Sequence, residues 1–174
     1  FSPCVETDER WEDEWHCIWE KPEGDQTLGQ VRVHPLENYE QLDDFDFPDM
    51  TVPERYDGIA ECIAENNEDK FVLGGVPLSF AHRLHYLRGF SEGMMDPYTN
   101  PDGLNRLLDR LADIAVDAIE GLARFEVDGI MSADDWGTED RAFVRPDIFA
   151  EFFKPRYERV YSKAHEHGML TFLH

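Results

Sequence analysis

Three short apolar runs recur in the second part of the chain, and segments with helical periodicity separate them. The runs are "KFVLGGV" (Lys70–Val76), "VDGIMSA" (Val127–Ala133) and "MLTFLH" (Met169–His174). Apolar runs of this length, with little polar alternation, are typical of strands that are buried on both faces. Because such strands alternate here with amphipathic helices, the sequence predicts an α/β fold with a parallel sheet covered by helices.

The segments between the runs carry clear helix signals. The longest follows Asn100, a natural N-cap, and has Pro101 at its first helical position. An apolar stripe marks one face of this helix, formed by Leu104, Leu107, Leu108, Leu111, Ile114, Ala115, Ile119 and Leu122. We expect further helices at residues 54–66, 79–90, 146–153 and 155–167, the last of them stopped by Gly168.

The N-terminal part has a different pattern. Trp11, Trp15 and Trp19 fit one face of a helix, and they fit one face of a strand equally well. The turn signal "KPEGDQ" and the strand-like "TLGQVRV" follow, so we favour a β-hairpin of residues 10–20 with residues 27–33. The next segment, "HPLENYEQLDDFDFPD", predicts a short helix and then an acidic connector stopped by proline.

Together these patterns predict a single partial domain, with the hairpin and connector in residues 1–52 and β/α units in residues 53–174. The three strands fit either a doubly wound sheet or part of a (β/α)8 barrel. Both folds place active sites at the carboxyl ends of their strands. The positions to inspect for function are therefore residues 74–77, residues 133–138 and His174.

Charge and composition exclude some classes of partner. The net charge of −22 argues against nucleic acid and anionic membranes, because their phosphates would be repelled. No segment approaches the roughly 18 consecutive apolar residues of a membrane span. Cys4, Cys17 and Cys62 are odd in number and far apart, which is typical of reduced thiols in a cytoplasmic protein. Because the chain starts at Phe1 and ends directly after an apolar run, we expect a piece of a longer protein.

Acidic side chains gather where the second apolar run ends, in "MSADDWGTED" (Met131–Asp140). Asp134 and Asp135 are candidates for a catalytic acid/base or for an acceptor that binds a ligand. The alternative is a turn that caps the following segment. Since adjacent residues at a strand end point in different directions, at most one of them is expected to face a pocket. Glu139 and Asp140 fit solvated loop acids.

The histidines offer one candidate at the same edge of the sheet. His174 follows the third apolar run, where a ligand or acid/base role competes with a structural one. His82 and His85 share a helix face at i, i+3, a spacing that suits a metal. No third ligand lies near them in the sequence, so we do not favour a metal there.

Four residues are predicted to bind the substrate: Trp136, Gly75, Arg88 and His85. Gly75 lies in "LGGVP", which lacks the spacing of a nucleotide-binding loop, and its alternative role is to let the chain turn tightly. Arg88 is a cation in a very acidic chain, suited to a carboxylate ligand. Its alternative role is a structural ion pair.

Segments scattered over most of the chain form a pattern: "DEWHCIW", "HPLENYEQLDDFDFPD", "YLRGFSEGMMD", "ADDWGTED" and "DIFAEFFKPRYERVYSKAHEHGMLTFLH". This pattern resembles the uroporphyrinogen decarboxylase superfamily, which includes corrinoid-dependent methyltransferases. The last segment is the most specific, with a proline-arginine-tyrosine helix before a strand that ends in histidine. The resemblance implies a (β/α)8 barrel with an N-terminal hairpin insertion. A closed barrel needs about 250 residues, so this chain would supply roughly three to four of its strands.

The resemblance implies one of two chemistries. The decarboxylases remove carboxyl groups from a porphyrinogen without a cofactor, and an aspartate stabilises the protonated pyrrole. The methyltransferases bind zinc through a His-x-Cys pair and a distant cysteine, and a zinc-bound thiolate attacks the methyl group of a corrinoid. "RLHYLRGF" and "DEWHCIW" resemble the methyltransferase branch, although His16 replaces its usual glycine. Asp135 stands where the decarboxylases tend to have serine, and His174 matches the zinc-binding histidine.

For the full-length protein the resemblance therefore implies zinc and a corrinoid as cofactors, or no cofactor if it is a decarboxylase. A tetrapyrrole or other small molecule is the implied substrate, and a corrinoid protein and a second copy of the chain are candidate partners. The piece alone is expected to be inactive. Outside the family, a barrel glycosidase that uses Asp134 or Asp135 with a second carboxylate and a non-catalytic binding barrel stay open.

Overall fold

The computed structural model describes residues 9–24, 27, 29–66 and 69–174. The chain divides into two compact units, and each is described by itself. Unit 1 comprises Phe1–Pro48 and Ala81–Leu107, and unit 2 comprises Asp49–Phe80 and Leu108–His174. Helices and strands are mixed throughout, which confirms the α/β class.

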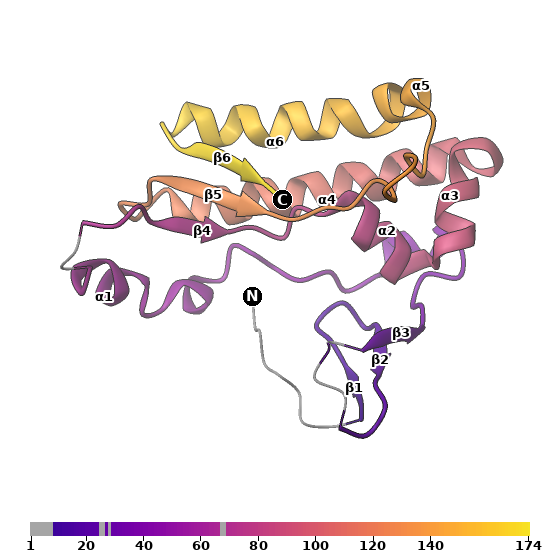
Figure 1. The fold of residues 1–174 in the computed structure, drawn as a ribbon, viewed down its shortest axis with the longest axis horizontal. Coiled ribbons are helices and arrows are strands. Elements are labelled where there is room, and N and C mark those ends of the chain that lie inside the picture. The colour runs from indigo at the N-terminus through magenta and orange to yellow at the C-terminus, as the bar shows by residue number, and fades with distance from the viewer. Residues whose placement is uncertain (1–8, 25–26, 28, 67–68) are drawn as a thin grey trace. The chain divides into compact units, whose positions relative to one another are not determined.

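Unit 2 is built on a parallel sheet. Its strands are β4 (Leu73–Gly75), β5 (Gly129–Ser132) and β6 (Leu170–Leu173), and they lie in the order β4-β5-β6 (Figure 1). Both pairs are parallel, in the register Gly75 to Met131 to Phe172. The parallel sheet predicted from the apolar runs is confirmed. Each strand is shorter than its predicted run.

The helices of unit 2 connect these strands. The 3-10 helix η2 (Pro53–Tyr56) and α1 (Ile59–Ala64) precede β4. The long α4 (Pro101–Leu122) begins as predicted, since the side chain of Asn100 accepts a hydrogen bond from the Gly103 N–H at 3.0 Å. In the described part of the chain, no helix is both long and apolar enough to cross a membrane.

Three consecutive helical segments lead from β5 to β6: α5 (Pro146–Ile148), the π-helix η3 (Phe149–Phe153) and α6 (Lys154–Glu166). The sequence predicted two helices here, and the structure joins them. Pro155 has no N–H to donate, which interrupts the regular i to i−4 ladder at the π turn. The predicted stop is confirmed, because Gly168 has a φ of +75° directly after α6.

Charged side chains pair α4 with α6. The partners follow one another in the same order along both helices, so the two helices run parallel (Figure 1). The pairs are Asp109 with Arg156, Asp113 with Arg159, and Glu120 with Lys163. Consecutive β/α units of a parallel sheet place their helices in this way.

The two faces of the parallel sheet differ in exposure. Ile130 and Ser132 are 1% and 4% exposed, whereas the side chains on the opposite face are open. Leu73, Met131 and Phe172 on that face are 40%, 41% and 51% exposed. The prediction that these runs are buried on both faces is therefore wrong for the described structure. Alternate side chains of a strand point to opposite faces, and the described helices cover one of them.

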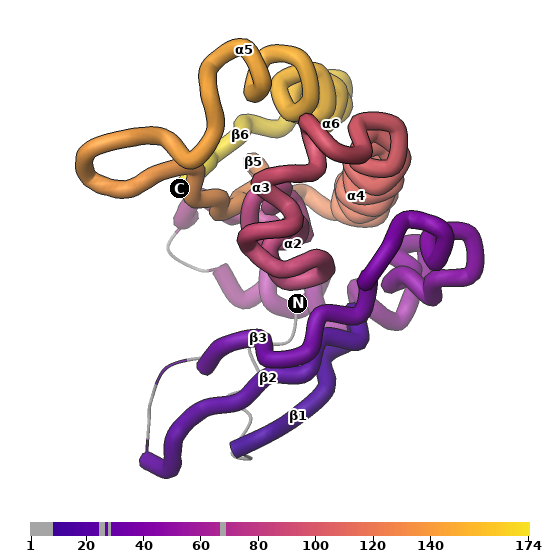
Figure 2. The backbone as a smooth tube through the Cα atoms, turned by 90° about the vertical axis from the view of Figure 1, so that its right-hand side faces the viewer, coloured from indigo at the N-terminus to yellow at the C-terminus, as the bar shows by residue number. Residues whose placement is uncertain are grey.

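Unit 1 contains an antiparallel sheet of β1 (Arg10–Glu12), β2 (Ile18–Glu20) and β3 (Gln30–Val33), visible as three adjacent segments in Figure 2. The hairpin with β3 is confirmed, but the prediction of one strand over residues 10–20 is wrong. The chain reverses between β1 and β2. Residues 25, 26 and 28 of the predicted turn and strand, like Cys4, lie outside the described residues.

The side chain of Asp13 explains the extra turn. Its carboxylate accepts hydrogen bonds from the N–H groups of Trp15 and Cys17, both at 2.9 Å, and from the indole of Trp19 at 2.8 Å. Trp11 and Trp19 consequently face each other across the strands, with ring centroids 6.1 Å apart, while Trp15 is buried in the turn. An aspartate that caps its own turn thus decided between the alternatives.

The helices of unit 1 are the 3-10 helix η1 (Tyr39–Asp43), α2 (Phe80–Arg88) and α3 (Phe90–Thr99). The short helix predicted after the hairpin is confirmed as η1. The sequence predicted one helix over residues 79–90 and missed α3. Gly89, with a φ of +88°, ends α2 and starts a new helix direction.

Candidate active site at the carboxyl end of the parallel sheet

The main chain brings Asp134 and His174 together beyond the strand ends. The His174 N–H donates to the Ser132 carbonyl, and the Asp134 N–H donates to the His174 carbonyl, both at 3.0 Å. The ladder between β5 and β6 therefore continues past both strands. Two residues predicted for the site from separate runs are neighbours at the carboxyl edge of the sheet.

The two adjacent aspartates have different surroundings. Asp134 is 7% exposed, and its carboxylate accepts hydrogen bonds from the hydroxyls of Tyr157 and, at 3.2 Å, Ser79. Asp135 is exposed. Of the two, Asp134 has the environment of a functional carboxylate, because its oxygens are held by fixed donors. The catalytic role of either aspartate stays a prediction.

Tyr157 links Asp134 to Trp136. The Tyr157 hydroxyl accepts a hydrogen bond from the indole Nε1–H of Trp136 at 2.9 Å and donates its own proton to Asp134. Burial, followed by the charge of Asp134, raises the pKa of Tyr157. The phenol therefore keeps its proton and remains a donor. The rings of Phe80 and Phe149 pack against it, with centroids 4.9 and 6.0 Å away.

The spacing of α6 matches that of β5. Tyr157 and Tyr161 are one helical turn apart, about 6 Å, and Ser132 and Asp134 are two strand residues apart, about 6.6 Å. Ser132 Oγ and Tyr161 OH are buried near each other, and neither has a partner with good hydrogen-bond geometry. Burial raises the pKa of Tyr161. One tyrosine of the pair is thus bonded to the carboxylate, and the other is not.

The acidic loop after Asp135 is a small hairpin. Gly137 and Ala142 form a β-bridge, and the Thr138 N–H donates to the Arg141 carbonyl at 2.8 Å. Glu139 and Asp140 at its tip are exposed, as expected for solvated acids.

The glycines of "LGGVP" lie in β4 and do not form the expected turn. Gly74 is needed for packing, because a Cβ atom there would lie 2.7 Å from Cδ1 of Leu122 in α4. Gly75 pairs with Met131, and the next residue, Val76, donates its N–H to the Met131 carbonyl at 3.1 Å. Gly75 therefore lies at the carboxyl end of β4, and its role in substrate binding stays a prediction.

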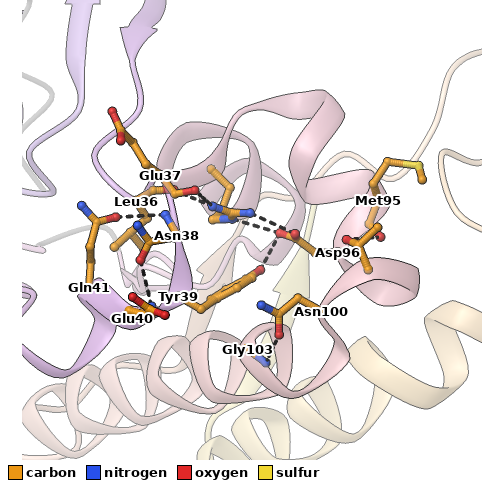
Figure 3. Close-up of polar contacts among 12 residues, drawn as sticks. Leu36, Glu37, Asn38, Tyr39, Glu40, Gln41, Met95, Asp96, Asn100 and Gly103 are labelled. Carbon is orange, nitrogen blue, oxygen red and sulfur yellow. Dashed lines mark hydrogen bonds and ion pairs between the residues drawn. The ribbon is translucent and has the colours of Figure 1, made fainter.

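Arg88 lies in unit 1, inside a buried network. Its Nε and Nη2 donate to the carboxylate of Asp96, each at 3.0 Å, and its Nη1 donates to the carbonyls of Leu36 and Glu37, both at 2.7 Å. The Tyr39 hydroxyl donates to the same carboxylate at 2.5 Å (Figure 3). Burial acts to lower the pKa of Arg88, but Asp96 raises it overall. The structural ion pair is present, and the substrate-binding role of Arg88 stays a prediction.

His85 also lies in unit 1. Its ring centroid is 6.2 Å from that of His34. Burial, and then the neighbouring His34 and His82, lower the pKa of His85, which keeps its ring neutral. Its predicted contact with a substrate is not tested by these contacts.

The residues present do not form a zinc site. Within residues 9–24, 27, 29–66 and 69–174, no group of three His, Cys, Asp or Glu side chains could hold a metal. Cys17 is buried in unit 1 and Cys62 is exposed, and both are free thiols. His174 is the single predicted ligand, and the described residues supply no thiolate beside it.

Sequence reasoning missed the partners of Asp134. Tyr157 and Ser79 hold its carboxylate, and Tyr161 and Ser132 form the adjacent buried pair. The sequence did contain one signal. The spacing of Tyr157 and Tyr161 along a helix is close to the spacing of Ser132 and Asp134 along an extended strand. That signal has meaning only once the helix is known to pack over the strand.

Comparison with known proteins identifies the family to which the chain belongs. A family model described as uroporphyrinogen decarboxylase (URO-D) matches residues 23–174, which is most of the chain and includes the whole Asp134 cluster. No curated protein matches the chain. The chain therefore belongs to the uroporphyrinogen decarboxylase family.

Proposed function

We propose that the sheet of unit 2 is part of a (β/α)8 barrel. Three observations support this: the strands follow chain order, they are parallel, and α4 runs parallel to α6. The exposed apolar face of Leu73, Met131 and Phe172 also fits the interior of a barrel, which apolar side chains fill in layers. Further strands would then bury this face.

We further propose that the protein is an enzyme of the corrinoid-dependent methyltransferase branch, with its reaction centre at the carboxyl edge of the sheet. The observation that carries the proposal is the main-chain bonding that places His174 beside Asp134 at the ends of β6 and β5. Active sites of barrels lie at this edge. Zinc would supply a thiolate nucleophile by lowering the pKa of a thiol.

Because the described residues form no zinc site, the role that follows from this chain is that of Asp134. Its carboxylate is buried and oriented by two hydroxyl donors. A fixed carboxylate can accept a proton or stabilise positive charge that develops on a bound substrate, and it acts strongly where water is excluded. His174 would contribute one ligand, and the thiolates would come from outside the described residues.

The same carboxylate supports one second candidate, decarboxylation of a porphyrinogen. A protonated pyrrole is a cation, and Asp134 is a buried anion held in one orientation. The glycosidase alternative needs two carboxylates that face one sugar. It pairs Asp134 or Asp135 with a second carboxylate elsewhere, and it stays a prediction.

The test uses the natural full-length protein that contains residues 1–174. Bound zinc, methyl transfer from a methylated corrinoid to a thiol, and consumption of uroporphyrinogen are measured in parallel. We expect the natural protein to bind zinc and to transfer the methyl group. His174→Ala should lose both the zinc and the methyl transfer. A zinc-free protein that consumes uroporphyrinogen would contradict the methyltransferase proposal and favour the decarboxylase.

Substitution of the loop acids tests the reaction centre. Asp134→Asn should lower kcat/KM by roughly 100-fold or more, a range typical for removal of one preorganised electrostatic group. Asp140→Asn is the matched control, because this exposed acid lies in the same loop, and it should retain activity. A larger loss in Asp135→Asn than in Asp134→Asn would move the proposed centre to Asp135.

A further inference from the structure

A hydrogen-bonded chain runs from Trp136 through Tyr157 to Asp134. The indole N–H donates to the phenol oxygen at 2.9 Å, and the phenol donates to Oδ2 of the carboxylate. Because the indole nitrogen is a donor only, the phenol proton is directed to Asp134. Tyr157 thus has a defined direction as a donor.

The two carboxylate oxygens of Asp134 are held by different elements. Tyr157 of α6 binds Oδ2, and Ser79, just before α2, binds Oδ1 at 3.2 Å. Two donors on opposite oxygens fix the rotation of the carboxylate about its last side-chain bond. The phenol of Tyr157 therefore influences the orientation of Asp134.

We propose that Tyr157 is a positioning residue, which holds the Asp134 carboxylate in one orientation toward the substrate. The inference rests on the proposed function, in which Asp134 acts at the reaction centre. Tyr157 itself is enclosed by Phe80, Phe149 and Trp136, and it acts through Asp134.

Tyr161 supplies a matched control within the same helix. Its hydroxyl is buried like that of Tyr157, and its ring centroid lies 5.8 Å from that of Tyr157. Its polar neighbour is Ser132, without good hydrogen-bond geometry, and it does not donate to Asp134. Replacing either tyrosine by phenylalanine removes one buried oxygen from α6, but only one of the two changes removes a donor from Asp134.

The experiment compares Tyr157→Phe, Tyr161→Phe and Asp134→Asn in the full-length protein, by whichever of the two reactions it catalyses. Tyr157→Phe should lower kcat/KM by roughly 10- to 100-fold, as expected for a lost hydrogen bond to a charged group. The loss should fall on kcat and leave KM nearly unchanged, because a carboxylate that is no longer held in one orientation weakens the reaction step more than substrate binding.

Tyr161→Phe is the control in the same experiment, and it should leave both kcat and KM unchanged. An independent readout is the near-ultraviolet titration of tyrosinate. In Asp134→Asn, the pKa of Tyr157 should move toward its ordinary value, since one of the causes that raise it is removed.

The outcomes are separable. If Tyr157→Phe behaves like Tyr161→Phe while Asp134→Asn is inactive, Tyr157 is only structural and the proposal for Tyr157 is wrong. If Asp134→Asn keeps wild-type activity, the proposed reaction centre fails and the role of Tyr157 fails with it. Should Tyr157→Phe not fold, Trp136→Phe takes its place. A smaller loss of kcat with unchanged KM would support the proposal, and unchanged kinetics would overturn it.

Discussion

Two buried aspartates of this protein each accept a hydrogen bond from a tyrosine, and the other donors described for them differ. Asp96 in unit 1 accepts from Tyr39 and from two nitrogens of Arg88. Asp134 in unit 2 accepts from Tyr157 and from the hydroxyl of Ser79. A guanidinium neutralises a carboxylate, whereas a hydroxyl orients it and leaves its charge. The same Tyr–Asp contact therefore serves a structural purpose in one unit and fits a reactive one in the other.

The position of each aspartate in the fold agrees with this difference. Asp96 lies on α3, and its partner Arg88 also binds the carbonyls of Leu36 and Glu37, so the network closes the chain segment before η1 onto the helices of unit 1. Asp134 follows a parallel strand, at the edge where α/β enzymes place their chemistry. We expect mutations to damage stability at the first aspartate and function at the second.

The largest effect is expected at Arg88. Arg88→Met keeps much of the side-chain volume but leaves the Asp96 carboxylate buried without its cation, which should lower the free energy of unfolding by about 3–5 kcal/mol. Urea unfolding followed by circular dichroism measures this. Arg145→Met is the control, since Arg145 and its partner Asp147 are both exposed, and it should change stability little.

A double variant sharpens the first prediction. Arg88→Met combined with Asp96→Leu removes both charges, so it should be more stable than Arg88→Met alone. If the double variant is less stable than the single one, the carboxylate is not the source of the loss, and the structural interpretation of this network is wrong.

The two tyrosines that donate to buried aspartates should differ in how much their hydroxyls contribute to stability. Tyr157→Phe removes a hydrogen bond from a charged group and should cost about 1.5–3 kcal/mol of stability. Tyr39→Phe should cost about 0.5–1.5 kcal/mol, because Arg88 continues to hold Asp96. Thermal unfolding of both variants under one condition compares them. Equal losses would remove the contrast between the two carboxylates.

Alkaline pH provides a third comparison. Burial, and then the neighbouring aspartate, raise the pKa of both Tyr39 and Tyr157. The folded state keeps these protons while the unfolded state loses them, so stability falls as the pH rises above about 10. Each of Tyr39→Phe and Tyr157→Phe should reduce this fall by about 1.4 kcal/mol at one pH unit above 10, as measured by urea unfolding. An unchanged alkaline slope in both variants would contradict the burial of these phenols.

The smallest effect is expected at Tyr161. Its buried hydroxyl lies near Ser132 without good hydrogen-bond geometry, so Tyr161→Phe should change the free energy of unfolding by no more than about 0.5 kcal/mol. A loss as large as that in Tyr157→Phe would show that Tyr161 has a bonded partner in solution. The distinction between the two tyrosines of α6 would then be lost.

The sequence by itself determined what depends on neighbours along the chain. Asn100 and Pro101 predicted the start of α4, Gly168 predicted the end of α6, and three apolar runs predicted a parallel sheet, because capping, glycine conformation and hydrophobic periodicity act over a few residues. The position of Asp134 at a strand end followed from the same pattern.

Only the tertiary structure decided which contacts those elements make. Asp13 capping its own turn split a predicted strand, Gly89 separated α3 from α2, and α6 packing over β5 brought Tyr157 to Asp134. Packing within unit 1 likewise brought the guanidinium of Arg88 to Asp96. Asp96 is therefore part of a structural ion pair, and Asp134 stays a candidate for chemistry. The physical reason is the distance along the chain over which each interaction acts. Periodicity, which is local, fixes which face of an element is apolar. The partner of a buried polar group is fixed by whichever distant segment packs against it.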